Sequence, residues 1–235
     1  MDPAPDPARE QAMETAPRSR DGSIHVTDER INTISHLVAS CFAVLGAALL
    51  VAQAGAEGDP WKIVGLSVYA ASLVTLFVAS TIHHGFDRGP RVNDILRTLD
   101  YTSVFGLIAG TVTPLVLVLE RTVAGWAVLG TVWGIAGLGI AARSVWRDLP
   151  KWVTNTLYIV LGWMPVALVL TGLSLPVGAL ALMAAGGVVY SAGFVIFILE
   201  RPNPVPGVFG FHEIWHLLVM LAAALHFLMM YAYVL

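Results

Sequence analysis

Seven long apolar runs constrain the fold of this chain more than any other feature of its sequence. They lie near residues 33–55, 61–84, 96–119, 123–142, 152–173, 177–199 and 208–235. Each run is long enough to cross a bilayer, because a spanning helix needs about 20 mostly apolar residues. The composition agrees, since only 12% of residues are charged, against about 25% in soluble domains. The sequence therefore predicts an all-α integral membrane protein with a bundle of seven transmembrane helices.

The predicted connections are too short to hold a second globular domain. We expect one membrane domain over residues 29–235, preceded by a disordered, polar tail over residues 1–28. Small residues in two of the runs should allow close helix packing; they are Gly134, Gly137, Gly139, Gly186, Gly187, Ser191 and Gly193.

The distribution of Lys and Arg predicts the orientation. If the N-terminus is cytoplasmic, the tail and the connections after the second, fourth and sixth runs hold 11 of the 13 basic residues, and only Lys62 and Arg121 lie outside. Basic residues in short loops stay on the cytoplasmic side. We therefore expect a cytoplasmic N-terminus and an external C-terminus. The abundant Ala and Gly suit a bacterial inner membrane, and the absence of a basic stripe argues against nucleic-acid binding.

A few polar side chains fall within or at the ends of the apolar runs, where an Asp costs about 2.5 to 3.5 kcal/mol. They are His36, Ser80, His83, His84, Asp100, His212, Glu213, His216 and His226. In the predicted topology, the end of the second helix and the starts of the third and seventh helices share the cytoplasmic level. Three polar groups distant in sequence should therefore meet at one depth, as in a single site.

The histidines in this group have the spacing of a metal site. His212 and His216 are four residues apart, which places both imidazoles on one helical face. His84 can supply a third nitrogen, and three imidazoles with one open position are typical of zinc. Asp100 is then a fourth ligand, a partner of bound water or a residue that orients a histidine. Ser80 lies one turn before His84 and can hydrogen-bond to water or to Asp100.

Other polar residues have simpler interpretations. His83 points about 100° away from His84 and is expected at the membrane interface. His36 and His226 are expected to be hydrogen-bonded within the bundle, and His226 lies about 15 Å beyond His216. Glu213 completes an H-E-x-x-H pattern typical of metalloproteases. That pattern stands in the last helix, so we expect Glu213 to face the headgroup region or the Arg-bearing loops.

Three blocks of the sequence together resemble the hemolysin III family, which is related to the adiponectin and progestin receptors. The blocks are Ser80-Thr-Ile-His-His84, then Leu99-Asp100-Tyr101 with the segment 109–114, and His212-Glu-Ile-Trp-His216. The resemblance implies zinc held by His84, His212 and His216, with Ser80 and Asp100 at the site, in a superfamily that includes the alkaline ceramidases. His83 stands where relatives more often have an aromatic residue, and the S-x-x-x-H spacing selects His84.

The leading hypothesis is a zinc-dependent hydrolase that cleaves an amide or ester bond of a membrane lipid at the inner leaflet. Asp100 would accept a proton or position the attacking water, and Ser80 would bind that water or the developing oxyanion. The alternative is a non-enzymatic receptor, sensor or homeostasis protein with a structural zinc. A pore-forming haemolysin is less favoured, since we expect neither a secretion signal nor a charged channel lining. The sequence leaves the oligomeric state open.

Overall fold

The computed structural model describes residues 19, 23–26, 29–146 and 149–235, and these residues form helices and no β-strand. Within them, seven helical segments are long and apolar enough to cross a membrane. The elements are α2 (Glu29–Glu57), α3 (Pro60–Gly85), α4 (Pro90–Pro114) with η1 (Leu115–Leu119), α5 (Val123–Val145), α6 (Lys151–Trp163), α7 (Pro165–Leu170), α8 (Val177–Leu199), α9 (Phe211–Met229) and η2 (Met230–Val234). The predicted fold class is confirmed.

Proline positions explain where the helices begin and where two spans are interrupted. Pro60 and Pro90 stand at the first turns of α3 and α4, where a missing N–H costs nothing. Pro114 ends the α-helical part of the third span, which continues as the π-helix η1. Pro165 separates α6 from α7 because proline cannot donate the backbone hydrogen bond that a continuous helix needs. The sequence pattern alone predicts one unbroken helix there.

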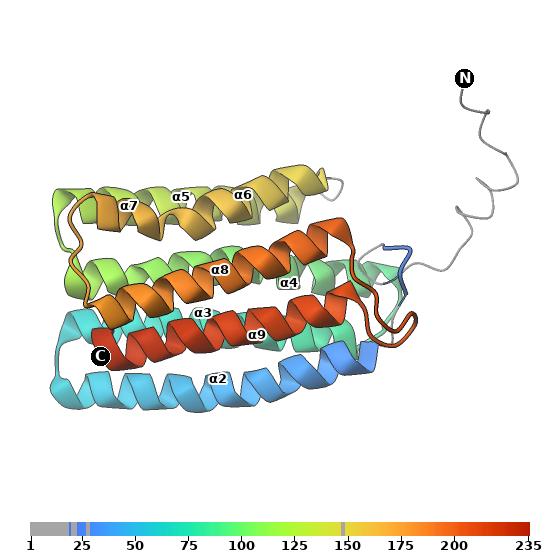
Figure 1. The fold of residues 1–235 in the computed structure, drawn as a ribbon, viewed down its shortest axis with the longest axis horizontal. Coiled ribbons are helices and arrows are strands. Elements are labelled where there is room, and N and C mark those ends of the chain that lie inside the picture. Colours follow the sequence, from blue (N-terminus) through green and yellow to red (C-terminus); the bar gives the residue numbers. More distant parts are fainter. Residues whose placement is uncertain (1–18, 20–22, 27–28, 147–148) are drawn as a thin grey trace, which may run out of the picture.

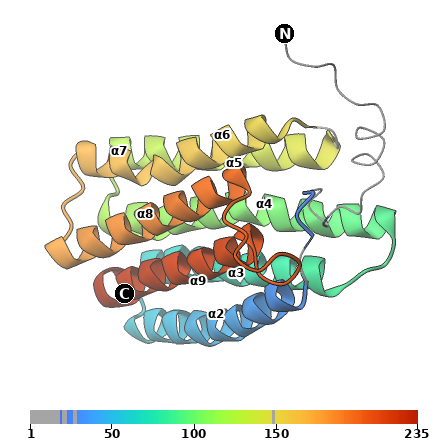
Figure 2. The ribbon, with the colours of Figure 1, turned by 45° about the vertical axis from the view of Figure 1, so that its right-hand side comes forward.

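The helices form a ring in which chain neighbours are antiparallel and the closing pair, α2 and α9, is parallel (Figures 1 and 2). α2 packs against α3 and α9, α3 packs against α4, α4 against α5, and α8 against α9. α6 lies beside α5 and makes few contacts with α8. The ring is therefore tightly packed around α2, α3, α4 and α9 and is loosest between α6 and α8.

Most of the connections that carry basic residues lie at one end of the bundle, which we call the site end. It contains the starts of α2, α4, α6 and α9 and the ends of α3, α5 and α8 (Figure 1). Arg88, Lys151 and Arg201 lie at this end, whereas Lys62 and Arg121 lie at the opposite end near Leu235. The segregation of basic residues used for the orientation prediction is thus a feature of the fold.

Most of the predicted tail lies outside the described residues, namely 1–18, 20–22 and 27–28. The part that is described contacts the site end. The Ser23 hydroxyl donates to Glu200 Oε2 at 2.8 Å, and the side chain of Ser23 is buried. The His25 ring meets the Phe211 ring edge-on, with 6.2 Å between centroids. Residues just before α2 therefore pack beside the connection from α8 to α9.

The expected role of the small residues holds at some positions only. A Cβ atom on Gly139 would lie 2.6 Å from the Phe105 ring, and one on Gly193 would lie 2.9 Å from Trp215. For Gly134 and Gly137, by contrast, no described atom outside their own helix turns lies within 4 Å. The packing prediction is wrong for these two, because they face outward on α5, and also for Gly187 of α8, where a Cβ atom would meet no described atom within 4 Å.

This difference gives a matched pair of substitutions. We expect Gly139→Ala to destabilise the protein by about 1 to 3 kcal/mol, because the added methyl group overpacks against Phe105. Gly137→Ala in the same helix should leave stability unchanged or raise it by up to about 1 kcal/mol, since Ala favours helix. Thermal unfolding in detergent measures both effects. Equal melting temperatures for the two variants would contradict the packing described for α5 against α4.

Candidate metal centre

Polar residues from four helices converge inside the site end. Ser80, His83 and His84 lie in the last turns of α3, and His212 and His216 lie in the first turns of α9. These turns lie at the same end of the bundle as the start of α2 (Figure 1), and Asp100 of α4 lies close to His83 and His84. The residues that sequence reasoning grouped by depth are therefore neighbours in the fold.

His84, His212 and His216, which we call the histidine cluster, have the geometry of a metal-binding group. Each offers one nitrogen, and these nitrogens all lie within 4.8 Å of one another. The ring centroids are 5.1 Å apart for His84 and His212, 4.7 Å for His84 and His216, and 4.8 Å for His212 and His216. All three side chains are buried.

The donor set suits a tetrahedral ion. Zinc binds nitrogens at about 2.0 to 2.1 Å, so two nitrogens in a tetrahedral zinc site are about 3.3 Å apart. The three histidine side chains would need to shift by about 1 Å to bind one zinc ion in this geometry. Within the described part of the chain, His216 Nδ1 is buried without a hydrogen-bond partner. A buried imidazole that lacks a partner is costly. The residues therefore fit a metal ion, which would also draw the three rings together.

A second group of potential ligands shares His84. His83, His84 and Asp100 also offer one atom each within 4.8 Å of one another. His83 is only 1% exposed, so its predicted position at the membrane interface is wrong. α3 packs against both α2 and α4, and Asp100 of α4 lies near His83, so a rotation of about 100° from His84 leads to another packed helix and not to lipid. Asp100 lies near His84, as expected, and is partly buried.

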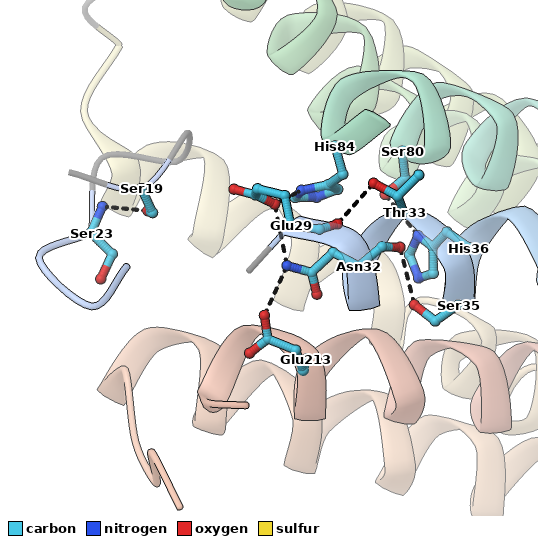
Figure 3. Close-up of polar contacts among 10 residues, drawn as sticks. All are labelled: Ser19, Ser23, Glu29, Asn32, Thr33, Ser35, His36, Ser80, His84 and Glu213. Atoms are coloured by element: carbon cyan, nitrogen blue, oxygen red, sulfur yellow. Dashed lines mark hydrogen bonds and ion pairs between the residues drawn. The ribbon is translucent and has the colours of Figure 1, made fainter. Parts of the chain in front are cut away.

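His36 of α2 belongs to the same site, which sequence reasoning missed. Its Nδ1 lies 2.7 Å from Ser80 Oγ, and its ring stacks on His216 with 3.8 Å between centroids. The expected hydrogen bond within the bundle exists, but its partner is a candidate site residue. Two further residues of α2, Glu29 and Asn32, also reach the site (Figure 3).

Glu213 does not face the headgroup region or the Arg-bearing loops, so that expectation is wrong. It is fully buried. Its Oε2 accepts from the backbone N–H of Gly210 at 2.7 Å, and its Oε1 accepts from Asn32 Nδ2 at 3.0 Å. At the third position of α9 this carboxylate caps the start of the helix. With both oxygens engaged in this way, the arrangement disfavours the metalloprotease interpretation.

His226 lies further along α9, away from the histidine cluster. Its Nε2 is 3.2 Å from the carbonyl oxygen of Met183 in α8, as expected for a hydrogen-bonded residue of the bundle.

A cavity of about 660 Å³ adjoins the histidine cluster. Its wall includes five polar residues of the site: His36, Ser80, Asp100, His212 and His216. The rest of the wall is largely apolar and comes from α4, α6, α8 and α9. It also includes Ile159 and Trp163 of α6 and Val195 of α8, which are 48%, 49% and 53% exposed on the outside of the bundle. The cavity therefore reaches the outer surface between α6 and α8.

The fold and this cluster define a multi-span membrane protein with a histidine-rich centre at one end of its bundle. Comparison with known proteins identifies the family of this chain. The model of the family described as haemolysin-III related matches residues 24–227. The chain is 30% identical over 216 residues to hemolysin-3 of Bacillus cereus, covering 89% of this chain and 93% of that protein. The chain therefore belongs to the haemolysin-III-related family.

Two further relatives show the breadth of this similarity. The hemolysin-3 homolog of Bacillus subtilis is 28% identical over 203 residues, which cover 86% of this chain and 92% of that protein. The human monocyte to macrophage differentiation factor is 27% identical over 206 residues, which cover 86% of this chain and 82% of that protein. The similarity thus covers most of the chain.

Metal analysis of purified protein tests the histidine cluster directly. We expect about one ion per chain in the wild type and none in the double variant His212→Ala/His216→Ala, because a single imidazole cannot retain the ion. His83→Phe should keep the ion, since His83 belongs only to the second ligand group. Loss of the ion in His83→Phe, with retention in the double variant, would move the site to His83, His84 and Asp100.

Proposed function

We propose that this protein is a zinc-dependent hydrolase that cleaves an amide or ester bond of a membrane lipid. One observation carries the proposal: the largely apolar cavity of about 660 Å³ has His212, His216, Ser80 and Asp100 in its wall. A cavity of this size can enclose a lipid chain. These four polar residues lie together at the site end of the bundle, where a head group with a scissile bond would lie.

The donor set favours zinc over other common ions. Neutral imidazoles suit zinc, whereas magnesium and calcium prefer oxygen ligands. His84, His212 and His216 would hold the ion and leave one position open. When bound in such a site, zinc lowers the pKa of a coordinated water toward about 7 and polarises a carbonyl oxygen.

Side chains of this protein would accept the proton of the attacking water and stabilise the negative charge that develops on the substrate. Asp100 lies beside His84 in the second ligand group, close enough to accept a proton from the attacking water or to orient it. Ser80 Oγ lines the cavity and can donate a hydrogen bond to an oxyanion that develops on the substrate. The His36 ring holds the Ser80 hydroxyl in place.

A lipid substrate follows from where the cavity opens. The opening lies between α6 and α8, among the half-exposed apolar side chains of Ile159, Trp163 and Val195. In a membrane these side chains contact acyl chains and not water. A substrate would therefore enter sideways from the bilayer, with its acyl chain in the apolar part of the cavity.

Activity against lipids tests this function. We expect zinc-loaded protein to release fatty acid from at least one member of a panel of lipid amides and esters, measured by mass spectrometry. Asp100→Asn should keep zinc but lower the rate by about 10² to 10⁴-fold, because a positioned proton acceptor contributes that much. Ser35→Ala, a change at a half-buried residue of α2 whose hydroxyl bonds within its own helix, is the matched control and should keep full activity. No release from any lipid by fully loaded protein would rule the hydrolase out.

The second candidate is a receptor, sensor or homeostasis protein in which zinc has a structural role. The position of the histidine cluster favours it, because the imidazoles come from α3 and α9, and an ion would tie these helices together. An ion that binds only the folded state stabilises it by about 2.7 kcal/mol at 100 times its dissociation constant. Under this alternative, zinc removal lowers the melting temperature and no lipid is turned over in any variant.

We further propose that the site end faces the cytoplasm, in a bacterial inner membrane, so that substrates come from the inner leaflet. The basic residues gathered at the site end support this orientation. A reporter fused after Leu235 tests it. Alkaline phosphatase, which is active only outside the cytoplasm, should be active there, while a fluorescent protein at the same position should be dark. The reverse pattern would contradict the orientation.

A further inference from the structure

The first turns of α2 supply no predicted metal ligand, yet they carry three polar residues on one face. Glu29, Asn32 and His36 are spaced by three and four residues, which aligns them along the helix. Asn32 and His36 are almost completely buried, and all three side chains point toward the ends of α3 and α9 (Figure 3). Each of them contacts a residue of the candidate site.

Glu29 contacts His84. Its Oε2 lies 2.6 Å from His84 Nδ1, and the histidine side chain is 1% exposed. An ionised carboxylate can only accept a hydrogen bond, so His84 Nδ1 carries the proton and donates. This arrangement selects the tautomer whose lone pair lies on Nε2. A carboxylate that accepts from one nitrogen of a histidine commonly orients the other nitrogen toward a metal ion.

Asn32 connects this carboxylate to α9. Its Nδ2 donates to Glu29 Oε2 at 3.3 Å and to Glu213 Oε1 at 3.0 Å. Glu213 directly follows His212 and caps the start of α9. One amide group therefore bridges two carboxylates and relates the position of His84 on α3 to that of His212 on α9.

His36 contacts two other residues of the site, Ser80 and His216. Its Nδ1 lies 2.7 Å from Ser80 Oγ, and its ring lies parallel to that of His216, with 19° between planes and 3.8 Å between centroids. The stacked ring limits rotation of His216 on one side. It also fixes the direction of the Ser80 hydroxyl at the wall of the cavity.

We propose that Glu29, Asn32 and His36 form a positioning layer for the metal centre. Glu29 sets the tautomer and ring orientation of His84, Asn32 sets the separation of α3 and α9, and His36 sets the orientation of His216 and Ser80. These are positioning residues and not ligands. The inference rests on the proposed function only in requiring that the histidine cluster binds zinc, and it assigns to α2 a part in that binding.

The test measures zinc affinity by competition with a chelator and the visible spectrum of the cobalt-substituted protein. We expect Glu29→Leu to weaken zinc binding about 10- to 100-fold, as removal of a carboxylate behind a ligand histidine generally does. Glu29→Gln keeps an acceptor oxygen and should lose less. The cobalt bands should shift in Glu29→Leu, because the spectrum reports ligand geometry directly.

Ser35→Ala is the matched control on the same helix. The Ser35 hydroxyl donates to the backbone oxygen of Asn32 at 3.1 Å, a hydrogen bond within its own helix (Figure 3), so zinc affinity and spectrum should stay as in wild type. His36→Leu gives an independent second variant in case Glu29→Leu does not fold. It removes both the stacking and the hydrogen bond, and we expect about 10-fold weaker zinc binding with shifted cobalt bands.

The outcomes separate this inference from the proposed function. Wild-type zinc affinity and spectrum in a folded Glu29→Leu or His36→Leu variant would overturn the positioning role of that residue, while zinc binding by the cluster would stand. Failure of the wild-type protein to bind zinc would overturn the proposed function and the positioning layer together. A general loss of stability alone would lower the melting temperature of the metal-free protein without moving the cobalt bands of the folded fraction.

Discussion

The burial of polar side chains without water determines how one end of this bundle is built. Imidazoles and carboxylates inside a membrane protein must find partners within the protein, because lipid offers none. At the site end they do so across helices: His84 with Glu29, Ser80 with His36, and Glu213 with Asn32. These contacts join α2 to α3 and to α9, and α2 also packs against both of these helices. Elsewhere in the described bundle such contacts between helices are more scattered, as between Trp133 and Thr113 and between His226 and the Met183 carbonyl.

The fold could be predicted from the sequence to a large extent, because hydropathy reports the spans directly. The seven apolar runs correspond to the seven spanning segments among the described residues, with ends that differ by a few residues. The hydropathy pattern could not predict the break in the helix before Pro165, because the residues on both sides of the break are apolar. Nor could it separate Gly139, packed on Phe105, from the outward-facing Gly137, because that depends on which neighbour α5 meets.

The candidate site was predictable in its depth but not in its surroundings. Charge counting and the i,i+4 spacing brought His84, His212 and His216 together correctly. The contributions of Glu29 and Asn32 were missed because their partners lie 55 and 181 residues away. A signal did exist, since polar residues at 29, 32 and 36 fall on one helical face. The errors for His83 and Glu213 share one cause: an ionisable residue near a helix end was assigned to the interface, whereas neighbouring helices cover that end.

The opening between α6 and α8 determines which measure of ligand concentration governs binding to the cavity. A ligand that reaches the cavity through this gap comes from the plane of the membrane, so binding depends on its mole fraction among the surrounding lipids. The molar concentration of the ligand in the bulk solution then does not determine how much of it is bound. In detergent, each added micelle dilutes the ligand at constant bulk concentration. Occupancy of the cavity would fall as detergent is increased, and it would recover in vesicles of the same lipid composition.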